Sequence, residues 1–389
     1  MNPGDPVHEG ELAVSAPDEA AIEEATDLTS PLALMVRQIT DIVVLPAAKL
    51  SANERSLAAD VLLQVLTKVD ASLREEVAKR VSRVNEAPPA LLRALLLDEP
   101  EVAENLIRHS ENLPDSLLIE CANSGTTAHR LSIASRIDLT SPVADEIVEN
   151  GELEAAKLLL RRDEFELSPK AIDILVSRST VDTELQALLL RRRELEPAHG
   201  FMMFWWVETE RRKRILSRFS LDRTIIQNAL QSLYPVVMRD KKADPLVKDI
   251  LIMMERRHRP RGVNGEAVSM DVVIKTLNVA RKYPTQEVIH ATGLIAGVSR
   301  ELAARILRDT TGEPFAVMCK SLGMPRGDFF KTVVDQTGEN PFTEEKAEDL
   351  LGVFDSMARD FSRAVLRYWD WDNNPRIASI TRLLGLDAE

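Results

Sequence analysis

The chain of 389 residues is poor in the residue types that disulfide-bonded and sheet-forming proteins use. It has two cysteines, Cys121 and Cys319, so no disulfide framework is expected, which fits a reducing compartment. Aromatic residues make up 4% of the chain, so Leu, Ala, Val and Ile must provide most of the burial. This composition favours packed helices over a β-sandwich.

Long apolar runs are also missing from the sequence. No run approaches the length that crosses a bilayer, and the N-terminus has neither the basic nor the apolar region of a signal peptide. We therefore expect a cytoplasmic protein with no membrane partner.

The motifs of the common catalytic and cofactor sites are absent as well. The sequence contains no Walker loop, dinucleotide fingerprint, nucleophile elbow or HExxH helix, and its 15 glycines are not grouped as a phosphate cradle requires. No cofactor, metal or catalytic residue is predicted, and we expect a non-enzymatic protein. A site built from scattered Asp, Glu and Arg leaves no motif, so catalysis stays open.

Basic residues are absent from the start of the chain. Residues 1–30 contain eight acidic residues and no Lys or Arg, and they have few large apolar side chains, which predicts a disordered acidic tail. Residues 191–261, called the basic belt below, contain 17 Lys or Arg and 9 Asp or Glu. The belt is either a solvated face or a surface for an anionic partner.

A leucine followed within three residues by a proline recurs in the first half of the chain. The leucines are Leu113, Leu139, Leu167 and Leu195, and they lie 26, 28 and 28 residues apart. Repeats of this length without strand signals indicate stacked helix pairs, because one pair cannot cover its own apolar face. We predict an N-terminal α-solenoid of short helix-pair repeats over residues 31–200.

The later segments also have helical patterns, so the fold class is predicted to be all-α. A C-terminal helical domain is expected over residues 201–340, and a long terminal helix that begins at the cap Thr343, followed by a tail, over residues 341–389. The helices expected between them span 222–237, 245–257, 267–282, 285–296, 299–309, 313–322 and 325–336.

The first helix of the repeat half has a clear sequence signature. Ser51 and Glu54 form a capping-box pattern. Behind them is an apolar stripe at helical period, which we expect to be buried; it consists of Leu57, Val61, Val65 and Val69, beside Ala58, Leu62 and Leu66.

Three segments resemble a known family. They are Ala128-His129-Arg130-Leu131-Ser132-Ile133-Ala134-Ser135-Arg136, then Phe204-Trp205-Trp206 followed by Glu210-Arg211-Arg212, and Ala296-Gly297-Val298 running through Arg308-Asp309 to Gly312. Through them, roughly residues 40–340 resemble an uncharacterised, mainly alphaproteobacterial family, domain of unknown function 2336. The repeat half is similar to HEAT-like and leucine-rich-repeat-variant solenoids. The resemblance implies an all-helical, repeat-bearing protein and supplies no reaction.

An arginine stands near the end of the apolar stretch in successive repeats. These residues are Arg108, Arg136, Arg162 and Arg192. If they share one face of the stack, they form a ladder that a protein partner can bind. Alternatively, each arginine bonds the carbonyl groups at the end of its own helix.

The densest aromatic cluster leads directly into a basic run. Its candidate partner-binding residues are Trp205, Trp206, Arg211, Arg212 and Arg214. Aromatic rings beside arginines suit stacking on bases or binding of an acidic peptide. The alternative is that the aromatic residues close the end of the repeat stack.

Three further patterns are weak matches to known metal, calcium and DNA sites. His109, Cys121 and His129 fit no compact zinc spacing. Residues 370–374 begin like a calcium loop but lack its glycine and its final glutamate. Residues 297–323 suggest a helix-turn-helix with few basic side chains, so DNA recognition by them is not expected.

The leading hypothesis is a non-enzymatic scaffold or adaptor that binds a protein partner through its repeat surface. The alternative is a nucleic-acid-associated helical-repeat protein that uses the basic belt, although the net charge of −13 argues against it. The acidic tail could also compete with a partner for the belt. Homodimerisation through the Thr343 helix stays open.

Overall fold

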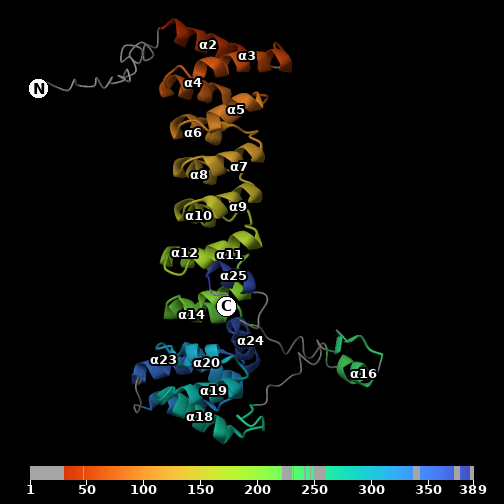
Figure 1. Cartoon of the computed structure of the whole chain (residues 1–389), viewed down its shortest axis with the longest axis vertical. Coiled ribbons are helices and arrows are strands. Elements are labelled where there is room, and N and C mark those ends of the chain that lie inside the picture. Colours follow the sequence, from red (N-terminus) through yellow and green to blue (C-terminus); the bar gives the residue numbers. More distant parts are fainter. Residues whose placement is uncertain are drawn as a thin grey trace, which may run out of the picture. The chain divides into compact units, whose positions relative to one another are not determined.

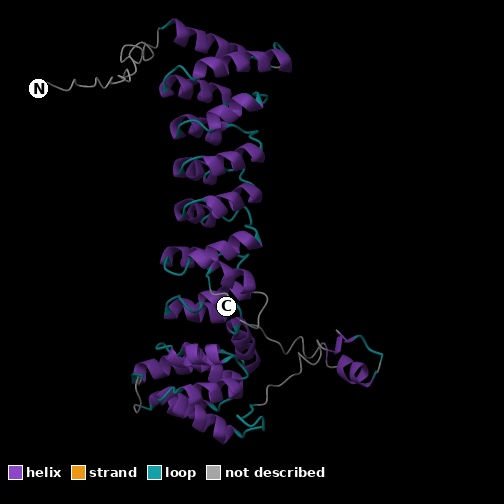
Figure 2. Cartoon of the chain, viewed as in Figure 1, coloured by secondary structure: helices purple, strands orange, loops and turns teal. Residues whose placement is uncertain are grey.

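The structure is a computed structural model, and its helices are labelled in Figure 1. It describes residues 30–46, 48–220, 230, 232–240, 242–245, 247–248, 260–335, 342–371 and 377–385. Within these ranges every regular element is a helix (Figure 2), and one isolated β-bridge joins Arg261 to Ala267. The predicted all-α fold class is confirmed. The chain divides into two compact units, unit 1 (Met1–Ser168) and unit 2 (Pro169–Glu389), which are described separately.

Unit 1 is a serial stack of short helices in two layers. Its helices are α2 (Pro31–Val43), α3 (Ala52–Leu66), α4 (Ala71–Val81), α5 (Pro89–Leu96), α6 (Pro100–His109), α7 (Asp115–Ser124), α8 (Thr127–Ala134), α9 (Ser141–Asn150) and α10 (Leu153–Leu160). One layer contains the even-numbered helices and the other the odd-numbered helices, and each helix packs on the next one in its own layer. Figure 1 shows this order of helices within the unit. The predicted stacking of helix pairs is therefore present.

Local sequence rules explain where these helices begin. The Ser51 hydroxyl accepts from the Glu54 backbone N–H at 3.3 Å and the Glu54 carboxylate accepts from the Ser51 N–H at 2.9 Å, so the predicted capping box is confirmed. Proline opens α5 and α6, where its missing N–H removes no helix hydrogen bond. The repeating Leu-Pro marks of this unit are also helix starts, because Pro114 is the N-cap of α7 and Pro142 lies in the first turn of α9.

The buried face of α3 agrees only in part with the predicted stripe, of which Leu62 and Leu66 are buried. Its core residues are Arg55, Ala59, Leu62 and Leu66. Leu57 and Val61, which we expected to be buried, are exposed. The sequence places apolar residues around most of α3, so periodicity alone does not identify the face that meets α2 and α5.

Unit 2 contains the remaining described helices. They are α11 (Pro169–Arg178), α12 (Thr183–Leu189), α13 (Pro197–Met203), α14 (Thr209–Arg218), α16 (Leu233–Arg239), α18 (Met270–Lys282), α19 (Gln286–Ala296), α20 (Arg300–Arg308), α21 (Glu313–Leu322), α22 (Arg326–Val334), α23 (Glu344–Ser356), α24 (Arg359–Trp369) and α25 (Ala378–Leu383). The helices expected at 267–282, 285–296, 299–309, 313–322 and 325–336 are present, with bounds within a few residues of the prediction.

Helix α21 lies in the core of unit 2, where it packs against α23 and α24. All of its residues except Lys320 are buried. A recognition helix must present its side chains to a DNA groove, and a helix covered on all sides cannot. The α20–α21 segment is therefore not a DNA-reading helix-turn-helix in this fold.

The terminal helix predicted from Thr343 is two helices. Thr343 caps α23 as predicted, since its hydroxyl accepts from the Lys346 N–H at 3.2 Å. The backbone then becomes extended at Met357 and Ala358, and α24 begins at Arg359. Arg359 donates from Nη2 to the carbonyl of Leu322 at 3.0 Å, which ties α24 to the end of α21. The prediction of one long helix was wrong because a tertiary contact sets the direction of α24.

Some predictions lie partly or wholly outside the described residues. These predictions are the acidic tail, much of the 222–237 helix, nearly all of the 245–257 helix, and the calcium-like motif after residue 371.

Candidate partner-binding surface

The arginines of the repeats lie mostly inside the stack. The side chain of Arg136 is 3% exposed and that of Arg192 is also 3% exposed. Arg136 donates from Nη1 to the carbonyl of Ile107 and from Nη2 to that of Ser110 at 2.9 Å. The expectation of one exposed arginine face is therefore wrong for these two residues, because the guanidinium of Arg136 bonds backbone carbonyls and that of Arg192 is buried beside the carboxylate of Glu194.

Successive arginines use equivalent acceptors. Arg162 donates to the carbonyls of Ala134 at 2.8 Å and Arg136 at 2.5 Å, which precede it by 28 and 26 residues. Arg218 donates to those of Leu190 at 2.6 Å and Arg192, at the same two offsets. We call Arg136, Arg162 and Arg218 the arginine ladder. Each rung satisfies carbonyl groups at the end of the preceding repeat rather than of its own helix.

Arg108 is not part of this ladder. Its side chain is 55% exposed and forms an ion pair with Glu104, one turn earlier in α6, at 2.7 Å. Arg218, by contrast, completes the ladder although the sequence analysis did not select it. Its 26-residue offset from Arg192 was the signal that could have found it.

The aromatic cluster is part of the core of unit 2. The indole rings of Trp205 and Trp369 of α24 lie 5.0 Å apart between centroids, and Trp369 Nε1 donates to the Phe201 carbonyl at 3.0 Å. Trp206 donates from Nε1 to the Ser179 hydroxyl at 3.1 Å. This placement favours the packing interpretation over stacking on a partner.

The basic run after the tryptophans is divided between core and surface. Arg212 is buried, and its Nη1 lies 3.3 Å from a carboxylate oxygen of Asp309 and 3.4 Å from one of Glu313. Arg211 donates to the Gln186 side chain at 3.1 Å, whereas Arg214 is exposed. Two of the three arginines therefore have partners within unit 2.

Buried Glu313 is the centre of this charged cluster. Its side chain is fully buried, and Lys346 of α23 donates to its Oε1 at 2.8 Å. Asp309 accepts from the backbone N–H groups of Thr311 at 2.9 Å and Gly312 at 3.0 Å. Since each carboxylate has a cation and hydrogen-bond donors, the cluster is a structural tie between α14, α21 and α23.

The suspected metal ligands have other partners. His129 Nδ1 accepts from the Thr126 N–H at 3.1 Å, and its Nε2 lies 3.0 Å from the Asp98 carbonyl. The Cys121 thiol donates to the Leu96 carbonyl at 3.1 Å, and burial raises its pKa to about 12. His109 is exposed at the end of α6. Among the described residues no group of three or more His, Cys, Asp or Glu side chains could hold a metal ion.

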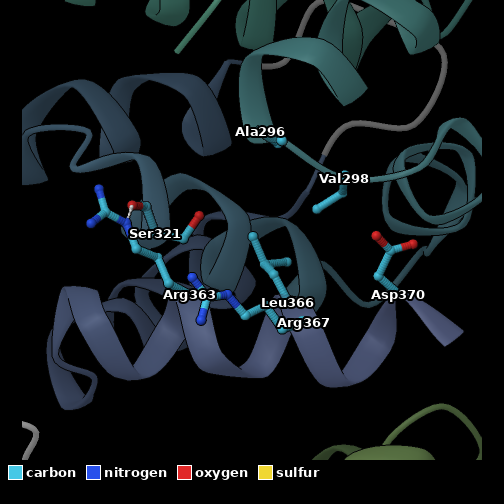
Figure 3. A pocket seen from close by; sticks show the side chains of 8 residues that line it. Ala296, Val298, Ser321, Arg363, Leu366, Arg367 and Asp370 are labelled. Atoms are coloured by element: carbon cyan, nitrogen blue, oxygen red, sulfur yellow. Dashed lines mark hydrogen bonds between the residues drawn. The ribbon is translucent and has the colours of Figure 1, made fainter. Parts of the chain in front are cut away.

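A small pocket of about 110 Å³ lies beside α24 (Figure 3). The turn Ala296–Val298 forms one wall, and Ser321 of α21 and Arg363 of α24 form another. Arg363 donates from Nε to the Ser321 carbonyl at 3.0 Å, as Figure 3 shows. Pockets for small molecules usually enclose at least about 300 Å³, so this pocket is better explained by the tie between α24 and α21.

The first helix pair of unit 1 carries the largest group of exposed apolar side chains in that unit. These are Leu34, Met35 and Ile42 on α2, and Leu57 and Val61 on α3. Across α4–α10, which are described in full, no helix exposes a large apolar side chain. The sequence pattern does not reveal this surface, here called the α2–α3 surface, because Leu57 and Val61 fit an apolar stripe that was expected in the core.

A second feature of the same helix pair is a pocket of about 360 Å³. It lies between the segments that follow α2 and α4, and its lining includes Arg55, Arg83 and Glu86 beside Leu45 and Val84. We call it the first-rung pocket, because Arg83 follows the end of α4 by two residues, as the ladder arginines follow α8 and α10.

Residues 102–367 match the model of a family described as an uncharacterised protein conserved in bacteria, DUF2336. The chain belongs to this family. The match includes α7–α10 of the stack and most of the helices of unit 2, including the aromatic cluster and the buried charged cluster, whereas α2–α5 precede it. Comparison with curated proteins and with solved structures gives no match. In the described residues no helix is long and apolar enough to cross a membrane.

Proposed function

We propose that this member of the DUF2336 family is a scaffold or adaptor that binds a protein partner through the repeat surface of unit 1, at the α2–α3 surface. The observation that supports the proposal is the concentration of exposed apolar side chains on the first helix pair. The first and last units of a repeat stack normally have a polar outer face. An apolar outer face on such a unit is typical of a binding surface.

The spacing of these residues fits recognition by a helical or extended partner segment. Met35 and Ile42 are seven residues apart, so they lie two turns apart on one side of α2. Leu57 and Val61 are four residues apart on one side of α3. Each helix therefore presents an apolar row to solvent, in addition to the row that it packs against its neighbours.

The contacts of the basic belt give less support to a nucleic-acid partner than the α2–α3 surface gives to a protein partner. Three of its described arginines are engaged within the chain, since Arg192 and Arg212 are buried and Arg218 bonds two backbone carbonyls, whereas Arg191 and Arg193 are exposed. Arginines that are already paired within the chain cannot neutralise phosphates without losing those bonds. We therefore keep the protein partner as the proposal.

Site-specific photo-crosslinking in the native cell tests the proposal. A photoreactive phenylalanine analogue replaces Leu57 or Met35 in the full chain, and Ser116, an exposed polar residue of α7, serves as the matched control position. We expect one and the same protein to be attached from both apolar positions and not from Ser116. Adducts that are identical at all three positions, or an adduct with a second copy of the chain, would contradict the proposal.

A further inference from the structure

We infer that the first-rung pocket binds a carboxylate group carried by an acidic segment of the protein partner. The inference deepens the proposed function and rests on it, because the pocket belongs to the helix pair that carries the α2–α3 surface. It names the chemistry by which the partner is recognised.

The first observation is a buried guanidinium with hydrogen-bonding capacity left over. Arg55 is 2% exposed and lines the pocket. Its Nη1 donates to the carbonyl of Val43, the last residue of α2, at 2.7 Å. Its Nε, like that of Arg136, is buried and has no hydrogen-bond partner, and Arg55 also lines the pocket. A buried donor without a partner is destabilising, and a carboxylate oxygen is the acceptor that suits a guanidinium best.

The second observation is a missing rung of the arginine ladder. Arg136 and Arg162 fill the equivalent positions later in the stack and bond the carbonyls of the preceding repeat. Arg83 occupies the same position after α4, but its side chain is exposed. Its guanidinium forms no hydrogen bond or ion pair with the described part of the chain. The acceptor at the end of α2 is already used by Arg55, so Arg83 stays available to a ligand.

The lining of the pocket indicates which anion it takes. Leu45 and Val84 provide apolar walls beside the two guanidinium groups, which suits the methylene groups of a Glu side chain. Glu86 adds one negative charge to the same lining, and like charges repel a dianion more strongly than a monoanion. A carboxylate is therefore favoured over a phosphate. The volume of about 360 Å³ admits one side chain and part of its backbone.

Fluorescence anisotropy with the full chain tests the inference. The probe is a labelled six-residue peptide of alternating Glu and Leu, and the control peptide has Gln in place of Glu. We expect the Glu peptide to bind at least about tenfold more tightly than the Gln peptide, because the charged hydrogen bonds are lost with the carboxylates. Binding should weaken as the salt concentration rises, since charges at a partly exposed site are screened.

Two variants with exposed side chains locate the binding site. Arg83→Gln should weaken binding of the Glu peptide by about tenfold, whereas Arg108→Gln, a matched change of an exposed arginine on α6, should leave it within about twofold. Equal binding by Arg83→Gln and the unchanged protein would overturn the inference. Displacement of the peptide by inorganic phosphate at a lower concentration than by glutamate would also overturn it.

The outcome is separable from that of the proposed function. A persistent photo-crosslink from Leu57 together with unchanged peptide binding by Arg83→Gln rejects the carboxylate pocket and keeps the partner surface. Loss of peptide binding by Arg83→Gln without any crosslink from Leu57 supports the pocket and rejects the α2–α3 surface.

Discussion

Replacement of Arg136 by methionine tests whether the arginine ladder holds the repeats together. Methionine is similar in length and unbranched, so it can fill the space of the arginine stem without a donor. The change removes three charge-assisted hydrogen bonds, to the carbonyls of Ile107 and Ser110 and to the carboxylate of Asp138 at 2.7 Å. Each such bond contributes about 1.5–3 kcal/mol. Without Arg136 the two carbonyl groups lose this donor, and a buried polar group left unsatisfied costs about 1–3 kcal/mol, so we expect a loss of about 2–6 kcal/mol in total.

Arg108→Met is the matched control for this prediction. Both arginines stand at corresponding places in the sequence pattern, but Arg108 is exposed and has one surface ion pair. Such pairs contribute about 0–1 kcal/mol, so this variant should be nearly as stable as the unchanged protein.

Urea unfolding followed by circular dichroism compares the free energies of unfolding of the two variants. Hydrogen exchange with mass spectrometry locates the effect, and we expect faster exchange in α6 and α8 for Arg136→Met alone. If Arg136→Met is no less stable than Arg108→Met, the carbonyl bonds contribute nothing measurable and the structural role assigned to the ladder is refuted.

Three further predictions follow from buried or paired groups. Arg212→Met leaves the carboxylates of Asp309 and Glu313 without their shared cation, and urea unfolding should show a loss of about 3–5 kcal/mol; a loss below about 1 kcal/mol would contradict a buried tie. Both cysteine thiols should resist an aromatic disulfide reagent in the native protein and react after unfolding, because burial raises the pKa of each; rapid native reaction would disagree with the structure. The Arg130 guanidinium lowers the pKa of Glu152 to about 2. This ion pair should therefore stabilise the folded protein fully above about pH 4.5, and its contribution should disappear as the pH falls towards 2. Acid unfolding curves of Glu152→Gln should lack this pH-dependent contribution.

Helix starts and the repeat period could be predicted from the sequence because they follow from local chemistry. Ser51 caps α3 with Glu54, and the proline of α5 stands where no N–H is needed, so a few neighbouring residues suffice to specify each start. The spacing of Leu113, Leu139 and later leucines likewise reports one structural unit per repeat.

The roles of individual side chains depended on neighbours that are distant in the sequence. Arg136 and Arg108 have similar local contexts, yet one bonds carbonyls of the preceding repeat and the other faces solvent. The apolar residues Leu57 and Leu62 both fit a helical stripe, and only packing against α2 and α5 determines that Leu62 is buried.

The sequence by itself determined the all-α class, the helix starts and the stacking of short repeats, because caps, prolines and periodicity act over a few residues. Only the tertiary structure decided that the arginines tie successive repeats, that the terminal helix divides at Met357, and that the first helix pair keeps an apolar surface. Each of these depends on which carbonyl or side chain a residue meets from another helix, and a local pattern does not contain that information.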